Sequence, residues 1–383
     1  MSLAARRVHS GLTILGCFAG GSLYGWSGYL PAVRAQFNVS TASASMVFSL
    51  ALFSFTLGVL LGPYVLARIS TPYRLAVLAG FAFLVLSFAA ASVGFTGFVL
   101  SYGLCFGFVA GAVYNHAISA ASASASATLL VPVSVAAFGL GGAVFGPVYV
   151  RLAASGWGLW SLVPALACFA IVAVLALAVR PLPALGKGDQ TQPEATISPN
   201  KTILTLGIIF ATGSSSGLIV LGFASQILPN GADAVGLASL AIFFAAIGNT
   251  IGRLSSALST GWFGPARAIM GALSLSMIAL GGLIFASTPA VVVGWMFLVA
   301  FAYGQLAATM PLLVRSQVSA LAFSSSFGWV FIGWGVAGLL GPWSAGWVMD
   351  MTGNIQISLI LCILLAALSL WLVSGFRKAE RPS

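Results

Sequence analysis

The stretch GLASLAIFFAAIGNTIGRLSSALSTGWFGPAR, from Gly236 to Arg267, decides how the whole chain is interpreted. Some twenty of its residues are apolar or small, which is about the length that a helix needs to cross a bilayer. Arg253 nevertheless lies inside the apolar part. A charge within a membrane span is costly, and by default it marks a functional site. Asn249 lies four residues earlier and therefore shares a helical face with Arg253.

An amide and a guanidinium on one helical face form a donor-rich patch that suits a carboxylate. The alternative is that Arg253 extends to the nearby membrane surface and has no other role. The position of Arg253, roughly 9 Å beyond the middle of the span at 1.5 Å per residue, makes this alternative geometrically feasible. We favour a functional arginine because of the free-energy cost of its position.

The composition identifies the class of protein. Of the 383 residues, 60% are hydrophobic and only 5% are charged, whereas a soluble domain carries about 25% charged residues. The chain is therefore expected to be a polytopic membrane protein. Its net charge of +10 is scattered between apolar runs, so it does not indicate nucleic-acid binding. The four cysteines lie in apolar segments without metal-ligand spacing, and we expect them to be buried. The sequence contains no nucleotide-binding loop and no cluster of metal ligands, so we expect no cofactor and no metal. We also expect no enzymatic activity, because no nucleophile–base set is present.

Apolar windows of span length recur along the chain and predict an all-α membrane protein. The twelve windows cover approximately residues 10–30, 44–66, 74–93, 96–118, 128–150, 157–179, 203–226, 236–259, 267–287, 290–313, 322–347 and 356–375. A polar, proline-rich segment at 181–201 divides them and is predicted to be a linker. The expected domains are thus one six-helix bundle at 1–180 and a second at 202–383.

The basic residues predict the orientation. Twelve of the fifteen Lys and Arg residues fall on the N-terminal side of the predicted membrane, only Arg34 and Arg151 fall on the other side, and Arg253 lies within a span. The positive-inside rule then places both termini in the cytoplasm. We expect an integral protein of a bacterial inner membrane, and a monomer.

The two halves contain an internal repeat. The run Gly142-Ala-Val-Phe-Gly146-Pro147 matches Ala337-Gly-Leu-Leu-Gly341-Pro342 at an offset of 195 residues, and residues 67–70 match 261–264 at an offset of 194. We expect the glycines of the first match, Gly142, Gly146 and Gly341, to allow close helix packing. Pro147 and Pro342 end the two packing motifs. Paired halves with a site at their interface are typical of transporters.

With twelve spans in two halves, the chain resembles the major facilitator superfamily over its whole length. The loop signature that follows the second and eighth spans of that superfamily is partly kept, in Arg68, Arg74, Gly264 and Arg267. Ala67 and Gly261 stand where the superfamily has aspartates. This difference argues against the usual charge-relay gating of the cytoplasmic side, but it leaves the fold unaffected.

Three stretches make the chain most similar to the oxalate/formate antiporter and monocarboxylate porter group: Tyr24–Pro31, Gly248–Arg253 and Phe331–Gly353. The resemblance implies a secondary active transporter that works by alternating access, with Arg253 as the substrate arginine. The dicarboxylate branch of this group has a lysine where Trp334 stands here. A single intramembrane cation suits a single carboxylate, so the resemblance implies a monocarboxylate substrate.

Further side chains complete the predicted site. Tyr24, Tyr303 and Trp334 are expected to line the cavity beside Arg253 and Asn249. Trp26 and Tyr29 could also line it, but aromatic residues near a span end are more typical of a belt at the membrane interface.

His116 is the only histidine inside a predicted span, and no Asp or Glu lies within one. It is therefore the candidate for proton coupling, although a neutral histidine bonded between helices, or an exchanger that needs no proton carrier, remains an alternative.

Two other functions remain open. The Gly142–Pro147 run resembles a motif of drug/proton antiporters, which keeps a drug or metabolite efflux antiporter as an alternative. A non-transporting membrane receptor or assembly factor with the same fold is another, because the loop signature is incomplete.

Overall fold

The computed structural model describes residues 3–122, 127–178, 200–229, 234–319 and 322–376, and all regular structure in these ranges is helical. Helices are the expected result, because an apolar segment in a bilayer must satisfy its backbone hydrogen bonds internally. Apart from its last two residues, the predicted linker at 181–201 lies outside the described residues.

The first half of the chain folds into a bundle in which each predicted span is present. Its elements are α1 (Leu3–Gly20), the 3-10 turn η1 (Gly21–Gly25), α2 (Trp26–Phe37), α3 (Thr41–Val65), α4 (Thr71–Ala91), α5 (Phe95–Phe98), the π-helix η2 (Val99–Phe106), α6 (Gly107–Ser122), α7 (Ala127–Leu152), η3 (Ala153–Trp157), η4 (Gly158–Leu162) and α8 (Val163–Ala178). Several of these elements together make one span; α1, η1 and α2, for example, make the first.

The second half is more regular, with one helix for each predicted span. Its elements are α9 (Lys201–Phe223), α10 (Ala234–Phe263), α11 (Pro265–Phe285), α12 (Pro289–Gln317), α13 (Phe323–Thr352) and α14 (Gln356–Ser374). The side chain of Asn200 caps α9 by accepting a hydrogen bond from the backbone N–H of Ile203 at 3.0 Å. Gly353, with a φ of +68°, ends α13 in the left-handed conformation that favours glycine.

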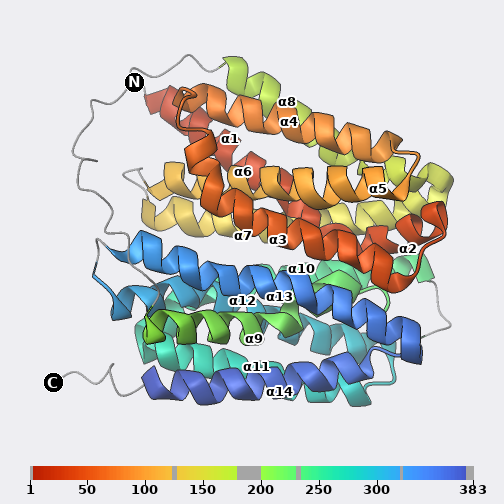
Figure 1. Cartoon of the computed structure of the whole chain (residues 1–383), viewed down its shortest axis with the longest axis vertical. Coiled ribbons are helices and arrows are strands. Elements are labelled where there is room, and N and C mark those ends of the chain that lie inside the picture. The colour runs from red at the N-terminus through yellow and green to blue at the C-terminus, as the bar shows by residue number, and fades with distance from the viewer. Residues whose placement is uncertain (1–2, 123–126, 179–199, 230–233, 320–321, 377–383) are drawn as a thin grey trace.

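The two bundles lie side by side, one above the other in Figure 1. α3 packs against α13 and α7 packs against α10, and these pairs form the interface between the halves. α1 begins and α14 ends at the same end of the molecule (Figure 1). We call this the terminal end and the other the opposite end; the predicted cytoplasmic side is the terminal end.

The first span is interrupted where the sequence predicted one continuous helix. The chain tightens into the 3-10 turn η1, at a point where it touches α7 closely: a Cβ on Gly21 would collide with the backbone carbonyl of Phe138. Only glycine permits two backbones to approach in this way. The interruption matters for the site because η1 carries Tyr24.

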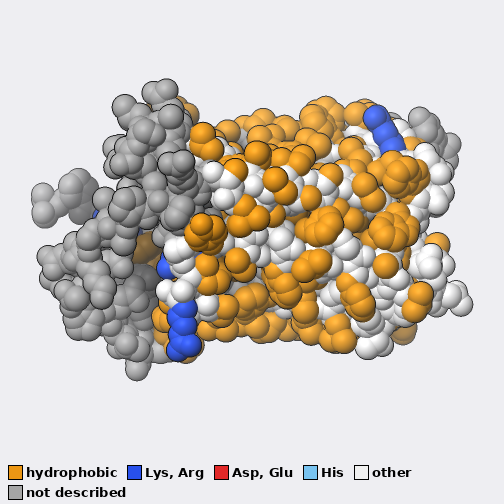
Figure 2. Space-filling model, turned by 90° about the horizontal axis from the view of Figure 1, so that it is seen from above, with side chains coloured by type: hydrophobic (Ala, Val, Ile, Leu, Met, Phe, Trp, Pro, Cys, Tyr) orange, Lys and Arg blue, Asp and Glu red, His pale blue; other side chains and the backbone are white. Residues whose placement is uncertain are grey.

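On the face drawn in Figure 2, hydrophobic side chains predominate between the two ends, and Lys and Arg are visible only near the ends. Phe88, Leu364 and Trp371 are among the exposed apolar side chains, which is the arrangement required by a lipid environment. Cys105 is exposed and Cys168 is only partly buried, so the prediction that all four cysteines are buried holds for Cys17 and Cys362 alone.

Trp26 and Tyr29 also differ from the prediction. Both side chains are fully buried rather than placed in an interfacial belt. Trp26 stacks on Phe48 and Tyr29 donates a hydrogen bond to the backbone carbonyl of Leu159 at 2.8 Å. Aromatic residues near a span end can belong either to the core or to the interface, and sequence position alone does not distinguish the two cases.

The opposite end is closed by hydrogen bonds between the halves. The carboxylate of Asp350, at the end of α13, accepts from the backbone N–H groups of Thr41 and Ala42 at 2.9 and 2.7 Å. These are free donors of the first turn of α3, where a negative charge is favourable. Nearby, Ser225 donates its hydroxyl to the backbone carbonyl of Ser27 at 2.7 Å.

Asp350→Asn should weaken this closure. Burial alone would raise the pKa of the Asp350 carboxyl, but the hydrogen bonds from Ala42 and Thr41 outweigh it and hold the pKa below its ordinary value of 3.8. The stabilisation is therefore fully present above pH 3.8 and is lost as the pH falls through the lower, folded-state pKa. We expect the free energy of unfolding of the variant to be lower by about 0.5–1 kcal/mol at neutral pH. The effect is small because the Asp350 side chain is exposed to solvent.

The measurement is the thermal unfolding midpoint of the purified protein over a pH series. The difference between wild type and Asp350→Asn should shrink in acid, where the wild-type carboxyl is protonated. Thr352→Ala is the matched control, because Thr352 bonds only within its own turn, to Val348 and Asn354. An equal loss of stability in both variants would contradict a specific role for Asp350.

Candidate functional site

A cavity of about 1100 Å³ lies between the two bundles. Its walls come from η1, α3, α6 and α7 of the first half and from α9, α10, α12 and α13 of the second. Lining residues near the terminal end are exposed, with Tyr64 at 74% and Trp329 at 46% of their full surface. The cavity therefore opens at the terminal end, while the hydrogen bonds of Asp350 and Ser225 close the opposite end.

All five predicted substrate-binding residues are joined in one hydrogen-bonded chain. Tyr24, Arg253 and Trp334 line the cavity, whereas Asn249 and Tyr303 are buried behind this lining, so Tyr303 does not line the cavity as predicted. Arg253 donates from Nε to the Oδ1 atom of Asn249 at 3.0 Å and from Nη2 to the hydroxyl of Tyr24 at 3.2 Å. The hydroxyls of Tyr24 and Tyr303 lie 3.1 Å apart, and the Trp334 indole donates to Tyr303 at 2.8 Å. The chain connects η1 of the first half to α10, α12 and α13 of the second.

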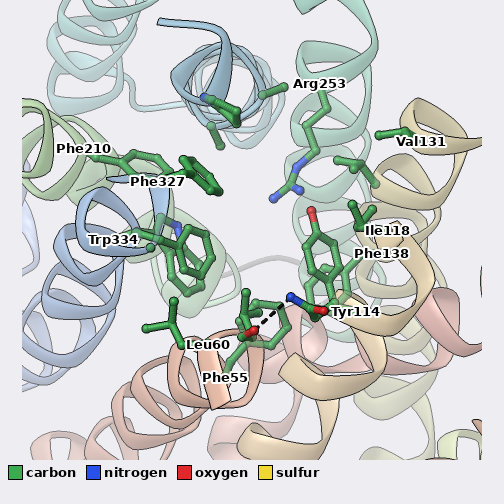
Figure 3. A pocket seen from close by; sticks show the side chains of 18 of the residues that line it. Phe55, Leu60, Tyr114, Ile118, Val131, Phe138, Phe210, Arg253, Phe327 and Trp334 are labelled. Atoms are coloured by element: carbon green, nitrogen blue, oxygen red, sulfur yellow. Dashed lines mark hydrogen bonds between the residues drawn. The ribbon is translucent and has the colours of Figure 1, made fainter. Parts of the chain in front are cut away.

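Arg253 points into the cavity and not towards lipid. Figure 3 shows its guanidinium directed into the open space, across from Phe327 and Trp334. The contact with Tyr24, which belongs to the other half, would be impossible if the side chain extended to the membrane surface. The geometry thus argues against the alternative in which Arg253 only extends to that surface.

The positive charge of Arg253 has no negative partner in the part of the chain that the structure describes. Asp350 is the only acidic residue in these ranges, and it is bound to α3 at the opposite end. Neutral oxygens of Asn249 and Tyr24 hold the guanidinium, and the hydroxyl of Tyr114 lies close to it. The N–H groups that these oxygens leave free can donate to a ligand. A charge-assisted hydrogen bond in such a shielded place is stronger than one in water.

The backbone packing of α10 explains how Asn249 and Arg253 reach the interface. Gly248 and Gly252 lie against the carbonyl groups of Phe297 and Phe301 on α12, where a side chain would collide. The adjacent face of α10, which carries Asn249 and Arg253, is thereby turned towards the first half. Asn249 is completely buried, and its Nδ2 atom has no hydrogen-bond partner among the described residues.

The predicted packing glycines differ in how closely they are packed. A Cβ on Gly142 would lie 2.7 Å from the Cβ of Tyr24, and one on Gly146 would collide with Ile242 of α10. The first repeat therefore holds Tyr24 in place and brings the halves together. At Gly341 the nearest atom would be 3.6 Å away, an ordinary contact. Pro147 and Pro342 each lie within their helices, α7 and α13.

His116 does not belong to this network. It lies on α6 and is 9% exposed, and its ring meets that of His9 on α1 edge to face, with centroids 6.0 Å apart. The Nε2 atoms of both histidines are buried and have no hydrogen-bond partner among the described residues. The two residues before it, Tyr114 and Asn115, do line the cavity. The predicted proton-coupling residue is thus close to the cavity but faces away from it.

Several lining residues were not predicted from the sequence. Phe55 and Phe138 of the first half and Phe210, Phe327 and Phe331 of the second line the cavity. A usable signal existed on α13, because Phe327 and Phe331 lie on the same helical face as Trp334. The residues on α3 and α7 had no such signal, because phenylalanine is common on every face of a membrane helix.

No protein-family model and no curated protein matches the chain in sequence. Solved structures match it in fold along almost its entire length. A D-xylose–proton symporter is 17% identical over 98% of this chain and 99% of its own, with a TM-score of 0.76. The nucleoside transporter NupG is 16% identical with 100% of both chains covered, and its TM-score is 0.71.

A third structure is a bacterial homologue of the human lysosomal transporter Spinster, in an inward-facing and unoccupied conformation. It is 14% identical, with 100% of both chains covered and a TM-score of 0.74. This chain has the major facilitator fold. The prediction of twelve transmembrane helices in two six-helix bundles is therefore confirmed. At these identities the likeness concerns the fold alone, so the major facilitator fold by itself does not identify a substrate.

Gly142→Ala should disturb the site through Tyr24. The added methyl group would overlap the Cβ of Tyr24, and overpacking of this kind costs about 1–3 kcal/mol. Gly281→Ala is the matched control, because no atom lies within 4 Å of its added Cβ, and alanine is favoured over glycine in a helix by about 0.5–1 kcal/mol. Thermal unfolding of the purified variants measures both effects. An unfolding midpoint of Gly142→Ala equal to that of the wild type would show that Tyr24 is not held in this way.

Proposed function

We propose that the protein is a secondary transporter of a small organic anion, a monocarboxylate, that works by alternating access. The observation that carries the proposal is the guanidinium of Arg253, directed into a cavity between the two bundles and without a negative partner in the described part of the chain. A buried cation without a counter-charge is costly. A carboxylate ligand would supply that counter-charge.

A single carboxylate suits this cavity better than two. Arg253 is the only charged side chain among the described residues that line it. The position that carries a lysine in dicarboxylate transporters of the group that the chain resembles is Trp334, whose indole is engaged with Tyr303. Arg253 offers a planar pair of donors that matches one carboxylate group.

The network also supplies a means of coupling binding to movement. Arg253 belongs to the second bundle and Tyr24 to the first, so a ligand at the guanidinium contacts the place where the halves meet. A neutralised pair can be enclosed in an apolar cavity at lower cost than a bare charge can. The loaded protein should therefore close and reorient more readily than the empty one, which favours exchange or symport over leakage.

With the terminal end in the cytoplasm, as the distribution of basic residues predicts, the cavity faces inwards. Lys201, Arg267 and Arg315 lie at the ends of α9, α11 and α12 on this side. The proposed cycle then requires the hydrogen bonds at the opposite end to break when the cavity opens outwards. The protein would act as an integral component of a bacterial inner membrane.

Arg253→Lys should abolish most transport although it preserves the charge. The ammonium group lacks the planar fork that donates to Asn249, Tyr24 and a carboxylate together. We expect carboxylate uptake into proteoliposomes to fall at least tenfold, because the loss of one charge-assisted hydrogen bond costs about 1.5–3 kcal/mol. Arg253→Gln should in addition abolish the thermal stabilisation of the purified protein by carboxylates.

Arg267→Gln is the matched control, because this arginine is exposed at the start of α11 and does not line the cavity. Uptake at the wild-type rate by Arg253→Lys would mean that the arginine has a structural role only. Carboxylate binding without any flux would indicate a receptor with this fold, and export of lipophilic cations would indicate a drug antiporter.

We also propose His116 as the proton-coupling group. His9 of α1 faces it, and Arg74 of α4 lies close enough to interact with it electrostatically. Both histidines have a buried Nε2 atom without a hydrogen-bond partner among the described residues, and an imidazole is the side chain that ordinarily titrates near neutral pH.

His116→Gln should flatten the pH dependence of uptake while anion exchange continues, because exchange needs no protonation step. Uptake along a proton gradient and counterflow exchange, measured in the same proteoliposomes, separate the two processes. His9→Gln tests the partner. Proton-driven uptake that survives in His116→Gln would exclude this coupling role.

A further inference from the structure

A continuous belt of aromatic side chains leads from the open end of the cavity towards Arg253. On α13, Phe323, Phe327, Phe331 and Trp334 follow one another at helical spacing and line the cavity. Their successive ring centroids are 5.8, 5.7 and 5.3 Å apart. These are the distances of rings in contact, so one wall of the cavity is an aromatic surface.

The belt continues across the interface into the first half. The ring of Trp334 contacts that of Phe55 on α3 with centroids 5.7 Å apart, and Phe55 contacts Phe138 on α7 at 5.3 Å. Phe138 in turn meets the ring of Tyr24 edge to face at 5.0 Å. Because Tyr24 accepts a hydrogen bond from Arg253, the belt ends at the guanidinium.

Free polar groups are scarce along the same walls. Among the described lining residues outside the hydrogen-bonded chain, the polar side chains are those of Tyr64, Tyr114, Asn115, Ser256 and Trp329. The hydroxyl of Tyr114 lies beside Arg253, at the end of the cavity where the carboxylate would bind. Asn115 donates to the backbone carbonyl of Val59 at 2.9 Å, and Ser256 donates to that of Arg253 at 2.8 Å. A second carboxylate on a ligand would lose its water there without gaining a second cationic partner, because Arg253 is the only charged side chain among the described lining residues.

We propose that the substrate is an arylalkanoate, a monocarboxylate whose acid group is joined by a short chain to an aromatic ring. This inference depends on the proposed function, because it assumes that the carboxylate pairs with Arg253. The ring then lies against Phe55, Phe138 and Trp334, where offset and edge-to-face contacts are available. Formate or oxalate would occupy a small part of the cavity of about 1100 Å³ and would gain nothing from the belt.

The first experiment compares four probes on the purified full-length protein: phenylacetate, cyclohexylacetate, acetate and 2-phenylethylammonium. Dissociation constants are obtained from concentration-dependent thermal shifts. Phenylacetate should bind at least about tenfold more tightly than acetate because its ring is removed from water. It should bind about threefold or more tightly than cyclohexylacetate because of the ring–ring contacts. The ammonium probe, which has the ring but the opposite charge, should not bind.

The second experiment changes the belt. Phe55→Leu keeps an apolar side chain of similar size but removes one ring next to the site, so the preference for phenylacetate over cyclohexylacetate should fall about threefold. Acetate affinity should not change, which also verifies that the variant is folded. Phe301→Leu is the matched control, because Phe301 stacks on Phe297 and does not line the cavity.

The outcomes distinguish this inference from the function on which it depends. Equal affinities for phenylacetate and acetate, both lost in Arg253→Gln, would overturn the arylalkanoate assignment and leave a carboxylate transporter. Equal affinities for phenylacetate and cyclohexylacetate would also overturn it, in favour of an apolar but non-aromatic acid. If no carboxylate binds in a manner that depends on Arg253, the proposed function itself fails.

Discussion

The organisation of this protein depends on how one guanidinium is kept inside a membrane. Arg253 cannot be placed in hydrocarbon without compensation, and three features supply it. Asn249 and Tyr24 provide neutral hydrogen-bond acceptors, the cavity provides access to water, and the opening at the terminal end lets an anion approach. Tyr24 and the cavity both require the two bundles to meet at this point, whereas Asn249 lies on the same helix as Arg253.

The close approach of the bundles explains the distribution of glycine. Gly21, Gly142 and Gly146 lie where η1 or α10 touches α7, and side chains at these positions would collide with the neighbouring element. These contacts position Tyr24, which is the only member of the hydrogen-bonded chain from the first half. Helix packing and the chemistry of the site therefore depend on the same few residues, because a shift of η1 would separate Tyr24 from Arg253.

The sequence predicted the architecture well because the bilayer restricts the possible structures. Apolar windows of sufficient length must become helices, and all the predicted spans are present. The meeting of Arg253, Asn249, Tyr24, Tyr303 and Trp334 was also anticipated, since ionisable and polar groups within spans are few. Whether these residues bind the substrate stays a prediction, as do the domain boundaries.

What the sequence did not provide was side-chain orientation in the apolar background. Trp26 and Tyr29 were expected at the interface and are buried, and His116 faces His9 and not the cavity. The phenylalanines of α3 and α7 were missed altogether. Hydrophobicity does not distinguish a lipid-facing side chain from one that faces the core or the cavity when all three surroundings are apolar, so these positions are fixed only by tertiary packing.

The hydrogen-bonded chain has a consequence for the sign of charge that the protein can accept. The indole of Trp334 and the guanidinium of Arg253 can only donate protons, and each donates one to a tyrosine oxygen. In the hydrogen bond between the hydroxyls of Tyr24 and Tyr303, only one of the two phenolic protons is donated. The other phenolic proton is left over, as are the protons on Nδ2 of Asn249. This surplus of protons over lone pairs repels a cation irrespective of its shape, and only a molecule that brings electron pairs of its own can balance it.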